Sequence, residues 1–412
     1  MLTTAIVGAG PYGLSIAAHL RRNGIPFRIF GRPMDSWRSH MPKGMMLKSD
    51  GFASNLDSPG GEFTLKEYCA ERGIPYSDTE IPVSLATFSS YGVAFQERMV
   101  PELEDRYVQR ITRLPEGFSL LLDNGESLRA RHVILAVGIT HFEYVPESLR
   151  HLPAEFCSHS FAHHHLEPFK GRHITVIGGG ASALGIAGLL RDVDCDSHLI
   201  ARGSKVTFHN GPDGSVPSLW KRIRHPRSGL GPGLRSRFYS DAPMAFRYLP
   251  EKLRVKIVRT ALGPSGGWTT RDKVIGRVPL FLGRTVERAE IKDGKVLLHM
   301  LGKDGSRSEL VTEHVIAGTG FRVDLDRLQF LAPEIRAEIK SVQRTPILSS
   351  TFESSVAGLH FVGVAAANSF GPVMRFAFGA RFAAERLTSM LKKSESRSRV
   401  SVPVAEPAAL TK

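Results

Sequence analysis

The chain has 412 residues, of which 42% are hydrophobic and 23% are charged, with 40 Gly and 25 Pro. At roughly 150 residues per domain this length predicts two or three domains, and the composition excludes collagen, coiled coils and wholesale disorder. With 54 basic and 40 acidic side chains the net charge is +14, which favours anionic ligands.

The chain opens with a strand, a glycine-rich turn and a helix. Residues 4–7 (TAIV) predict a buried strand, residues 8–13 (GAGPYG) a turn, and residues 14–22 a helix. In a G-x-G-x-x-G turn the first glycine permits the tight bend, the second lets the backbone approach a pyrophosphate, and the third allows close helix–sheet packing. The helix N-terminus then donates N–H groups to phosphates. The candidate cofactor-binding residues here are Gly8, Gly10, Pro11 and Gly13.

An aromatic and methionine-rich stretch follows the next predicted strand, residues 27–30. Trp37 precedes residues 41–47 (MPKGMML), whose polarizable side chains suit packing against a flat ring, and an ordinary methionine-lined core is the alternative. Trp37, Met46 and, farther along the chain, Val108 are the candidate cofactor contacts of this kind.

The strand–turn–helix pattern occurs a second time in the middle of the chain. Residues 173–177 (HITVI) predict a strand, residues 178–183 (GGGASA) a turn, and the following run a helix to about residue 191. Alanine in the third glycine position is still small enough for close packing. The candidate cofactor-binding residues are Gly178, Gly180 and Ala183. Two such units predict an α/β fold with two Rossmann-like dinucleotide-binding domains.

The acid that binds the ribose in such sites stands roughly 20 residues after the first glycine. The equivalent positions hold Gly31 in the first unit and Ala201 in the second, and neither is acidic. Arg202 and Lys205 follow Ala201. An arginine beside the ribose accommodates a 2′-phosphate, which favours NADPH over NADH, and two solvated surface bases are the alternative.

Four further segments organise the rest of the chain. Residues 130–138 and 313–320 each predict a buried strand that ends in a glycine turn. Residues 203–267 are rich in Gly, Pro, Arg and aromatic residues without clear periodicity, and predict an irregular lid. Residues 392–412 are polar and contain Pro, and predict a disordered tail.

Residues 368–376 (NSFGPVMRF) gather an amide, a cation and two aromatic rings around a Gly-Pro break. The candidate substrate-binding residues are Asn368, Phe370 and Arg375. A capped helix start with Arg375 on the surface is the alternative.

Several signals are missing from the sequence. No zinc-finger spacing, RNA-binding signature, basic helix or run of roughly 20 apolar residues occurs, so we expect neither a nucleic-acid partner nor a membrane span. The three consecutive imidazoles at residues 163–165 cannot all reach one ion, and no metal is expected. Cys69, Cys157 and Cys195 form no C-x-x-C pair. Their sparse, odd number and the absence of a leader-like segment favour a cytoplasmic protein. The sequence gives no indication of oligomeric state.

Together with Ala317–Phe321 (AGTGF), the two glycine turns carry a family resemblance. Over residues 1 to about 390 the chain resembles flavoproteins with two dinucleotide-binding domains, and more narrowly the single-component FAD- and NAD(P)H-dependent monooxygenases, which include lysine and ornithine N-hydroxylases. The resemblance implies that the first domain binds FAD and that the second, inserted into the first, binds NADPH or NADH. It adds Gly320 and Phe321 as cofactor contacts. The expected divisions are 1–165 (FAD domain, first part), 166–312 (NAD(P)H domain with the lid), 313–391 (FAD domain, return segment) and 392–412 (tail).

Branches of this class differ at recognisable positions. The disulfide-reductase branch needs a redox dithiol, which the cysteine spacing excludes. The Gly-Asp pair of that branch and of many carrier reductases is Gly363-Val364 here. The Baeyer–Villiger fingerprint is only echoed at residues 156–160, whereas His159-Ser160 is similar to the His-Ser of N-hydroxylases. The monooxygenase branch fits better.

The resemblance therefore implies a monooxygenase that uses FAD, NAD(P)H and O₂ and activates oxygen at the flavin C4a atom, as a (hydro)peroxide, in a dry pocket. This chemistry demands no acid–base triad, so no catalytic residue is assigned. Residues 30–34 and 368–376 resemble a bacterial group with an FAD-dependent urate hydroxylase, and Arg375 and Asn368 could grip the urate monoanion. N-hydroxylation of lysine or ornithine is the alternative substrate chemistry. Two other classes are a reductase that serves a quinone or protein carrier, and a binding protein with degenerate nucleotide sites, which the two intact glycine motifs disfavour.

Overall fold

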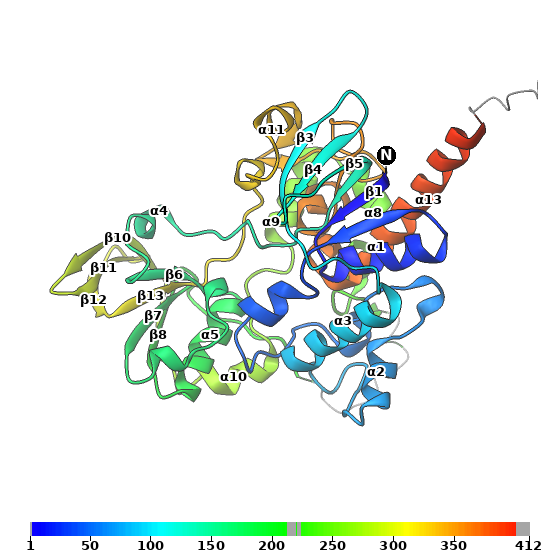
Figure 1. The fold of residues 1–412 in the computed structure, drawn as a ribbon. Helices are drawn as coiled ribbons and strands as arrows, with labels where there is room; N and C mark the ends of the chain where they lie inside the picture. Colours follow the sequence, from blue (N-terminus) through cyan, green and yellow to red (C-terminus); the bar gives the residue numbers. More distant parts are fainter. Residues whose placement is uncertain (1, 212–219, 221–223, 401–412) are drawn as a thin grey trace, which may run out of the picture.

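The computed structural model describes residues 2–211, 220 and 224–400. Two units stand side by side, the first built on a mixed sheet in which β3, β4 and β5 pair antiparallel and the second on a parallel sheet, and the chain passes from the first unit to the second and back again (Figure 1). The predicted α/β fold with two Rossmann-like units, the second inserted into the first, is confirmed.

The first sheet has the strand order β2-β1-β5-β4-β3, and β16 pairs with the end of β5. Its strands are β1 (Leu2–Val7), β2 (Phe27–Phe30), β3 (Val108–Arg113), β4 (Phe118–Leu122), β5 (Ser127–Leu135) and β16 (Leu359–Phe361). Val7 is in register with both Phe30 and Leu135, and Leu135 with Phe361. The carboxyl ends of these four parallel strands therefore meet at one edge, where an α/β sheet binds its ligands.

Helices cover the first sheet. They are α1 (Pro11–Arg22), α2 (Leu65–Glu71), α3 (Leu85–Met99) and α13 (Ala380–Val400). Their starts follow from the sequence: Pro11 occupies the first turn of α1, where no N–H partner is needed, Thr64 caps α2 in a capping box, and Ser84 caps α3. Helix α13 lies along α1 (Figure 1).

The second sheet is entirely parallel, in the order β6-β13-β7-β8-β9. Its strands are β6 (Cys157–His159), β7 (His173–Ile177), β8 (Asp196–Ala201), β9 (Leu280–Leu282) and β13 (His314–Ala317). Helices α5 (Ala181–Asp192) and α10 (Trp268–Val274) cover one face, and the antiparallel sheet of β10 (Arg284–Lys292), β11 (Lys295–Gly302) and β12 (Arg307–Thr312) covers the other. Side chains alternate between the faces, since Ile316 packs with α5 while Val315 and Ala317 pack with β10 and β11.

Three expectations about the organisation need correction. Strands β6 and β13 pair within the second sheet, so the expected boundaries at 165/166 and 312/313 leave one strand on the wrong side each time. The predicted irregular lid, where described, holds helices α7 (Leu234–Asp241), α8 (Pro243–Arg247) and α9 (Glu251–Thr260). Residues 392–400 of the expected tail are helical, because α13 continues to Val400, and residues 401–412 lie outside the described part.

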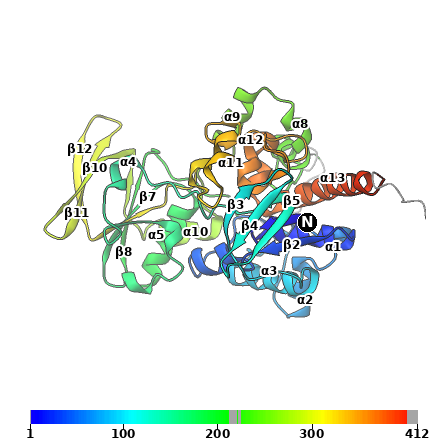
Figure 2. The ribbon, with the colours of Figure 1, turned by 45° about the horizontal axis from the view of Figure 1, so that its top comes forward.

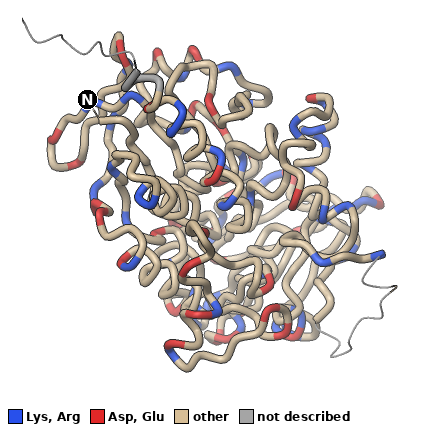
Figure 3. The backbone as a smooth tube through the Cα atoms, turned by 90° about the vertical axis from the view of Figure 1, so that its right-hand side faces the viewer, with Lys and Arg blue, Asp and Glu red and all other residues tan. Residues whose placement is uncertain are grey.

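Helices α7, α8 and α9 pack on the first unit, although they were expected to belong to the second. Leu230, Tyr239, Phe246 and Ala261 are buried in the first unit's core. Figure 2 shows α8 and α9 beside α12 (Ala367–Phe370). The smaller elements are α4 (Glu147–Arg150), α11 (Pro333–Glu338), β14 (Ser341–Val342) and β15 (Thr345–Pro346). Basic and acidic residues are interspersed along the chain (Figure 3).

Candidate active site

The first glycine turn lies between β1 and α1, and the three glycines differ in what requires them. Gly8 has φ +111°, and a Cβ there would lie 2.4 Å from the carbonyl oxygen of Ala136. A Cβ on Gly13 would lie 1.8 Å from the Gly8 oxygen. A Cβ on Gly10 would meet no protein atom within 4 Å. The fold therefore requires the outer glycines, and the open space at Gly10 suits the backbone approach of a pyrophosphate.

The second glycine turn, between β7 and α5, has the same form, except that Ala183 takes the place of the third glycine. A Cβ on Gly178 would lie 2.3 Å from the Gly318 oxygen, whereas one on Gly180 would meet only the Pro264 Cβ, at 3.9 Å. Ala183 is fully buried, and a Cβ on Gly318 would lie 2.6 Å from the Ala183 Cβ. Alanine in the third position is thus accommodated because residue 318 lacks a side chain.

The first unit has the opposite arrangement at the same place. There the helix residue is Gly13, and the residue that faces it is Ala136, whose Cβ would lie 3.5 Å from a Cβ on Gly13. Each unit therefore places one alanine and one glycine at the contact between its helix and the strand that closes the nucleotide site. The first glycine in AGTGF, Gly318, therefore compensates for the last alanine in GGGASA, Ala183.

One cavity of about 810 Å³ joins the two units. Its wall includes the first glycine turn, the ends of β2 and β5, residues 41–49, the inner side of α5 and α10, and residues 374–377. The predicted site residues on this wall are Gly8, Gly10, Pro11, Trp37, Met46, Val108, Phe321 and Arg375. The predicted residues not on it are Gly13, Gly178, Gly180, Ala183, Arg202, Gly320, Asn368 and Phe370. The second turn still borders the cavity through the α5 residues that follow it.

Tyr12, which sequence reasoning did not select, ties the first glycine turn to the C-terminal return segment. Its hydroxyl lies 3.1 Å from the Met374 oxygen and 3.0 Å from the Phe376 oxygen and donates to these carbonyls. Burial raises the pKa of Tyr12 above its usual value, so the phenol stays a donor. Gly379 leaves room for it, since a Cβ there would lie 2.4 Å from the Tyr12 hydroxyl.

The charged side chains on the cavity wall are predominantly basic. Its basic side chains are Arg32, Lys48, Arg106, Lys273 and Arg375, and Asp35 is the single carboxylate among the described residues that line it. Burial lowers the pKa of Lys48, and the charge of Arg375 lowers it further. Burial also lowers the pKa of Arg375, although the side chain remains partly open to solvent, and its Nη1 donates to the Val258 oxygen at 3.0 Å. Two neighbouring cations of this kind favour a bound anion.

Trp37 stands in a single π-helical turn, Ser36–His40, and its ring packs edge-on against Phe88 with 4.8 Å between centroids. Such turns often occur at functional sites. His40 stacks on Phe161 at 4.4 Å and so connects this turn to the segment between β6 and β7 of the second unit.

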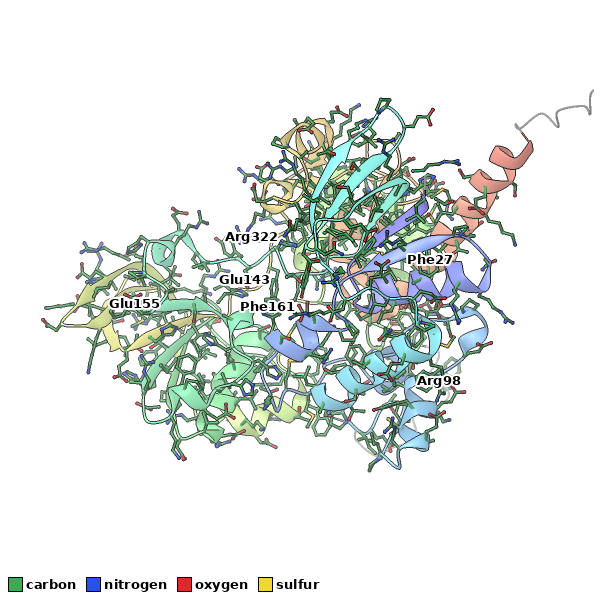
Figure 4. All side chains as sticks on the ribbon, viewed as in Figure 1. Phe27, Arg98, Glu143, Glu155, Phe161 and Arg322 are labelled. Carbon is green, nitrogen blue, oxygen red and sulfur yellow. The ribbon has the colours of Figure 1, made fainter. Side chains whose placement is uncertain are left out.

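The two linkers between the units meet beside the cavity, where Figure 4 labels Glu143, Phe161 and Arg322 near the junction. His159 Nε2 lies 3.0 Å from the Gly320 oxygen, and Phe321 packs edge-on against His159 and Phe161. Burial lowers the pKa of His159 to about 4. The neutral imidazole can donate its Nε2 proton to the Gly320 oxygen.

Two predicted substrate-binding residues lie elsewhere. Phe370 is fully buried against Phe352 and Phe382, with ring centroids at 4.2 and 5.5 Å, because α12 turns its side chain into the core. Asn368, also on α12, is half-buried, and its backbone oxygen accepts from Arg254 at 3.0 Å. Arg202 is exposed at the carboxyl end of β8.

The consecutive histidines 163–165 diverge. His163 Nε2 lies 2.6 Å from Ser158 Oγ, His164 Nδ1 lies 2.5 Å from the Met41 oxygen, and His165 faces Glu167. The three cysteines are free thiols, and none lines the cavity. No helix in the described ranges is long and apolar enough to cross a membrane.

The fold and the cavity define an oxidoreductase with two nucleotide-binding units. The profile of the pyridine nucleotide-disulphide oxidoreductase family matches residues 5–225, more than half of the chain. The protein belongs to this family, and the absence of a paired dithiol separates it from members that reduce disulfides through one. Comparison with curated protein sequences gives no match.

Several solved structures share the fold. The ornithine N-hydroxylase of Kutzneria sp. 744 has a TM-score of 0.76 at 14% identity, covering 96% of this chain and 100% of that one. The ornithine hydroxylase of Pseudomonas aeruginosa has a TM-score of 0.75 at 16% identity, covering 95% and 99%. The bacillithiol disulfide reductase of Staphylococcus aureus has a TM-score of 0.63 at 15% identity, covering 95% and 98%. At these identities the likeness concerns the fold.

Proposed function

We propose that the protein is an FAD-dependent monooxygenase that uses NADPH or NADH and O₂ to hydroxylate a small anionic molecule. The observation that carries this proposal is the cavity that borders the first glycine turn on one side and α5 of the second unit on the other. A continuous space of this kind allows two nucleotide cofactors to meet at their reactive rings. The solved ornithine hydroxylases supply the likeness of fold.

The chain's own residues fit these cofactors. Gly10 and the N-terminus of α1 would hold the pyrophosphate of FAD, and Gly180 and the N-terminus of α5 that of NAD(P)H. Arg202 directly follows β8, and an arginine at this position in such folds can accommodate a ribose 2′-phosphate, which supports NADPH. When bound, FAD supplies the transfer of electrons from the nicotinamide to oxygen. Met34 and Trp37 are apolar wall residues that would keep water from the reacting atoms.

For the substrate, Lys48 and Arg375 favour an anion, because two neighbouring cations on the cavity wall gain from a shared negative charge. Urate, a monoanion with amide-like edges, has this chemistry. N-hydroxylation of a lysine- or ornithine-like amine is the second candidate, and the fold likeness and Asp35, a carboxylate on the wall, favour it. A substrate that carries both a carboxylate and an amine could use the two cations and the Asp35 carboxylate together.

The experiment that tests the proposal measures oxygen uptake and H₂O₂ release by the purified protein with NADPH or NADH, against a panel of urate, lysine, ornithine and ketones. We expect an anionic substrate to stimulate NAD(P)H oxidation with little H₂O₂. A protein that reduces quinones or dyes rapidly and shows slow, unstimulated oxygen uptake would instead be a reductase for a quinone or protein carrier.

Two variant series separate the cofactor site from the anion site. Gly10→Val should abolish flavin binding while the unfolding temperature of the cofactor-free protein stays nearly unchanged, because a Cβ at this position would meet no protein atom within 4 Å. Lys48→Met should raise the KM for the anionic substrate with the flavin still bound, whereas Lys43→Met, the same change at an exposed lysine off the wall, should not. Stoichiometric flavin in Gly10→Val would contradict the FAD assignment.

A further inference from the structure

A second cluster of polar side chains lies far from the cavity, at the opposite end of the second sheet. His173 is the first residue of β7 and Asp196 the first residue of β8, and the parallel register pairs these two residues directly. His198 follows Asp196 by two residues, so its side chain emerges on the same face of β8. Strand register and alternation therefore bring the two imidazoles and the carboxylate together.

The donor atoms of this cluster converge. His173 Nε2 lies 2.9 Å from His198 Nδ1 and 4.0 Å from Asp196 Oδ2, and the three ligand atoms lie within 4.8 Å of one another. His173 and His198 are half-buried, and the His198 ring also packs against Phe281 with 5.7 Å between centroids.

Surrounding groups hold the three ligands in place. Arg191 Nη2 lies 2.9 Å from Asp196 Oδ1 and also donates to the Ser197 oxygen at 2.9 Å, which leaves Asp196 Oδ2 toward His173. The His173 backbone N–H donates to the Glu313 carboxylate at 2.7 Å. Partners of this kind orient metal ligands in proteins. The Arg191 cation reduces the negative charge at the site, so binding should be of moderate affinity.

We propose that His173, Asp196 and His198 form a binding site for a divalent copper or nickel ion. With bonds of about 2.05 Å, nitrogens 2.9 Å apart subtend about 90° at an ion, the angle of square-planar and octahedral coordination. A tetrahedral zinc ion needs about 3.3 Å between these nitrogens. Two imidazoles and one carboxylate suit these ions, and water would fill the remaining positions.

The site clamps β7 to β8 and takes no part in the oxidoreductase chemistry. Gly178 follows the far end of β7, five residue steps from His173, which is about 16 Å along the strand. An ion there would cross-link two neighbouring strands below the second nucleotide turn. The expected consequence is a more stable second unit, since a ligand that binds only the folded state raises the unfolding temperature as its concentration rises.

The test uses the untagged full-length protein after removal of metal with EDTA. We expect calorimetric titration with Ni²⁺ to give saturable binding of one ion per chain, a rise in the unfolding temperature with Ni²⁺, and a Cu²⁺ paramagnetic resonance spectrum with two nitrogen ligands. His198→Gln should abolish all three signals. Absence of saturable binding to the wild-type protein would overturn the proposal.

A matched control comes from β11 of the same unit. His299 also contacts two carboxylates, but its Nε2 faces Glu290 and its Nδ1 faces Glu309, so no common point for an ion exists. His299→Gln should keep Ni²⁺ binding, and loss there with retention in His198→Gln would refute the assignment. Asp196→Asn preserves the shape of the side chain, and it should weaken Ni²⁺ binding while the circular dichroism spectrum stays unchanged. It therefore tests the site in a folded protein, independently of any folding defect in His198→Gln.

Discussion

The pairing of Ala183 with Gly318 is the reverse of the pairing of Gly13 with Ala136, and it can be tested by interchanging the residues at positions 183 and 318. Gly318→Ala would place a Cβ 2.6 Å from the Ala183 Cβ, where ordinary contact begins at 3.4 Å, so the helix start and the strand end must separate by about 0.8 Å. Overpacking of this kind costs about 1–3 kcal/mol, and the reduced freedom of the unfolded chain returns about 0.4–1 kcal/mol. We expect a net loss of about 1–2 kcal/mol in the free energy of unfolding.

Ala183→Gly should relieve this clash in part, because it removes the Ala183 Cβ but leaves the Cα of residue 183, which a Cβ on residue 318 would approach to 2.8 Å. Alone it costs about 0.5–1 kcal/mol, because glycine is less favourable than alanine in a helix. In the double variant, residue 183 is glycine and residue 318 alanine, which reproduces the pairing of Gly13 with Ala136 in the first unit. The double variant should therefore be more stable than Gly318→Ala, with a favourable coupling of about 1–2 kcal/mol between the two sites.

The assay is urea unfolding of the wild-type protein, both single variants and the double variant, followed by calorimetric titration with NADP⁺. Gly185→Ala is the control, since it lies on the same helix and its new methyl group would meet no protein atom within 4 Å. This control should be as stable as the wild type or more stable. Strictly additive losses, or an undiminished stability in Gly318→Ala, would refute the packing argument.

Three further outcomes follow from individual contacts. Tyr12→Phe removes the hydroxyl contacts with the carbonyls of residues 374–376 and should lower the free energy of unfolding by about 1–3 kcal/mol, measured by urea unfolding; an unchanged midpoint would contradict the anchoring role. Arg202→Ala should raise the KM for NADPH by about tenfold or more and leave that for NADH nearly unchanged, and equal changes would remove the 2′-phosphate assignment. His159 and His360 have their pKa values lowered by burial to about 4 and about 3. Because the unfolded chain binds these protons first, the free energy of unfolding should fall as the pH drops from about 6.5 to 4. His360→Gln should make this fall shallower when unfolding is measured over a series of acid pH values. The same pH dependence in the variant and the wild type would contradict the role of His360.

The sequence determined the local architecture of this protein. The alternation from strand to glycine turn to helix is encoded within some 20 consecutive residues, because apolar periodicity and glycine placement act on neighbouring positions. Both turns, the two-unit fold and membership of an oxidoreductase family follow from it, and these predictions are confirmed. The position of residues 8–11 on the cavity wall follows too.

Local pattern was a poor guide where helices are short or amphipathic. The Gly-, Pro- and Arg-rich segment 203–267 has weak periodicity, yet its helices gain stability by burying Tyr239 and Phe246 against the first unit. Phe370 and Arg375 are close in sequence, but α12 and the Gly-Pro break turn one into the core and the other to the cavity. Spacing along the chain could not separate these two directions.

Only the tertiary structure decided which distant residues share a site. Lys48 and Arg375 meet because the return of the chain to the first sheet brings residues 374–377 beside residues 41–49. Gly318 compensates for Ala183 across the contact between a helix and a strand, and His173 meets His198 through the register of two parallel strands. Such pairings depend on the order and register of strands, which many residues determine jointly. The sequence therefore specified the nucleotide-binding turns, and packing specified what else surrounds them.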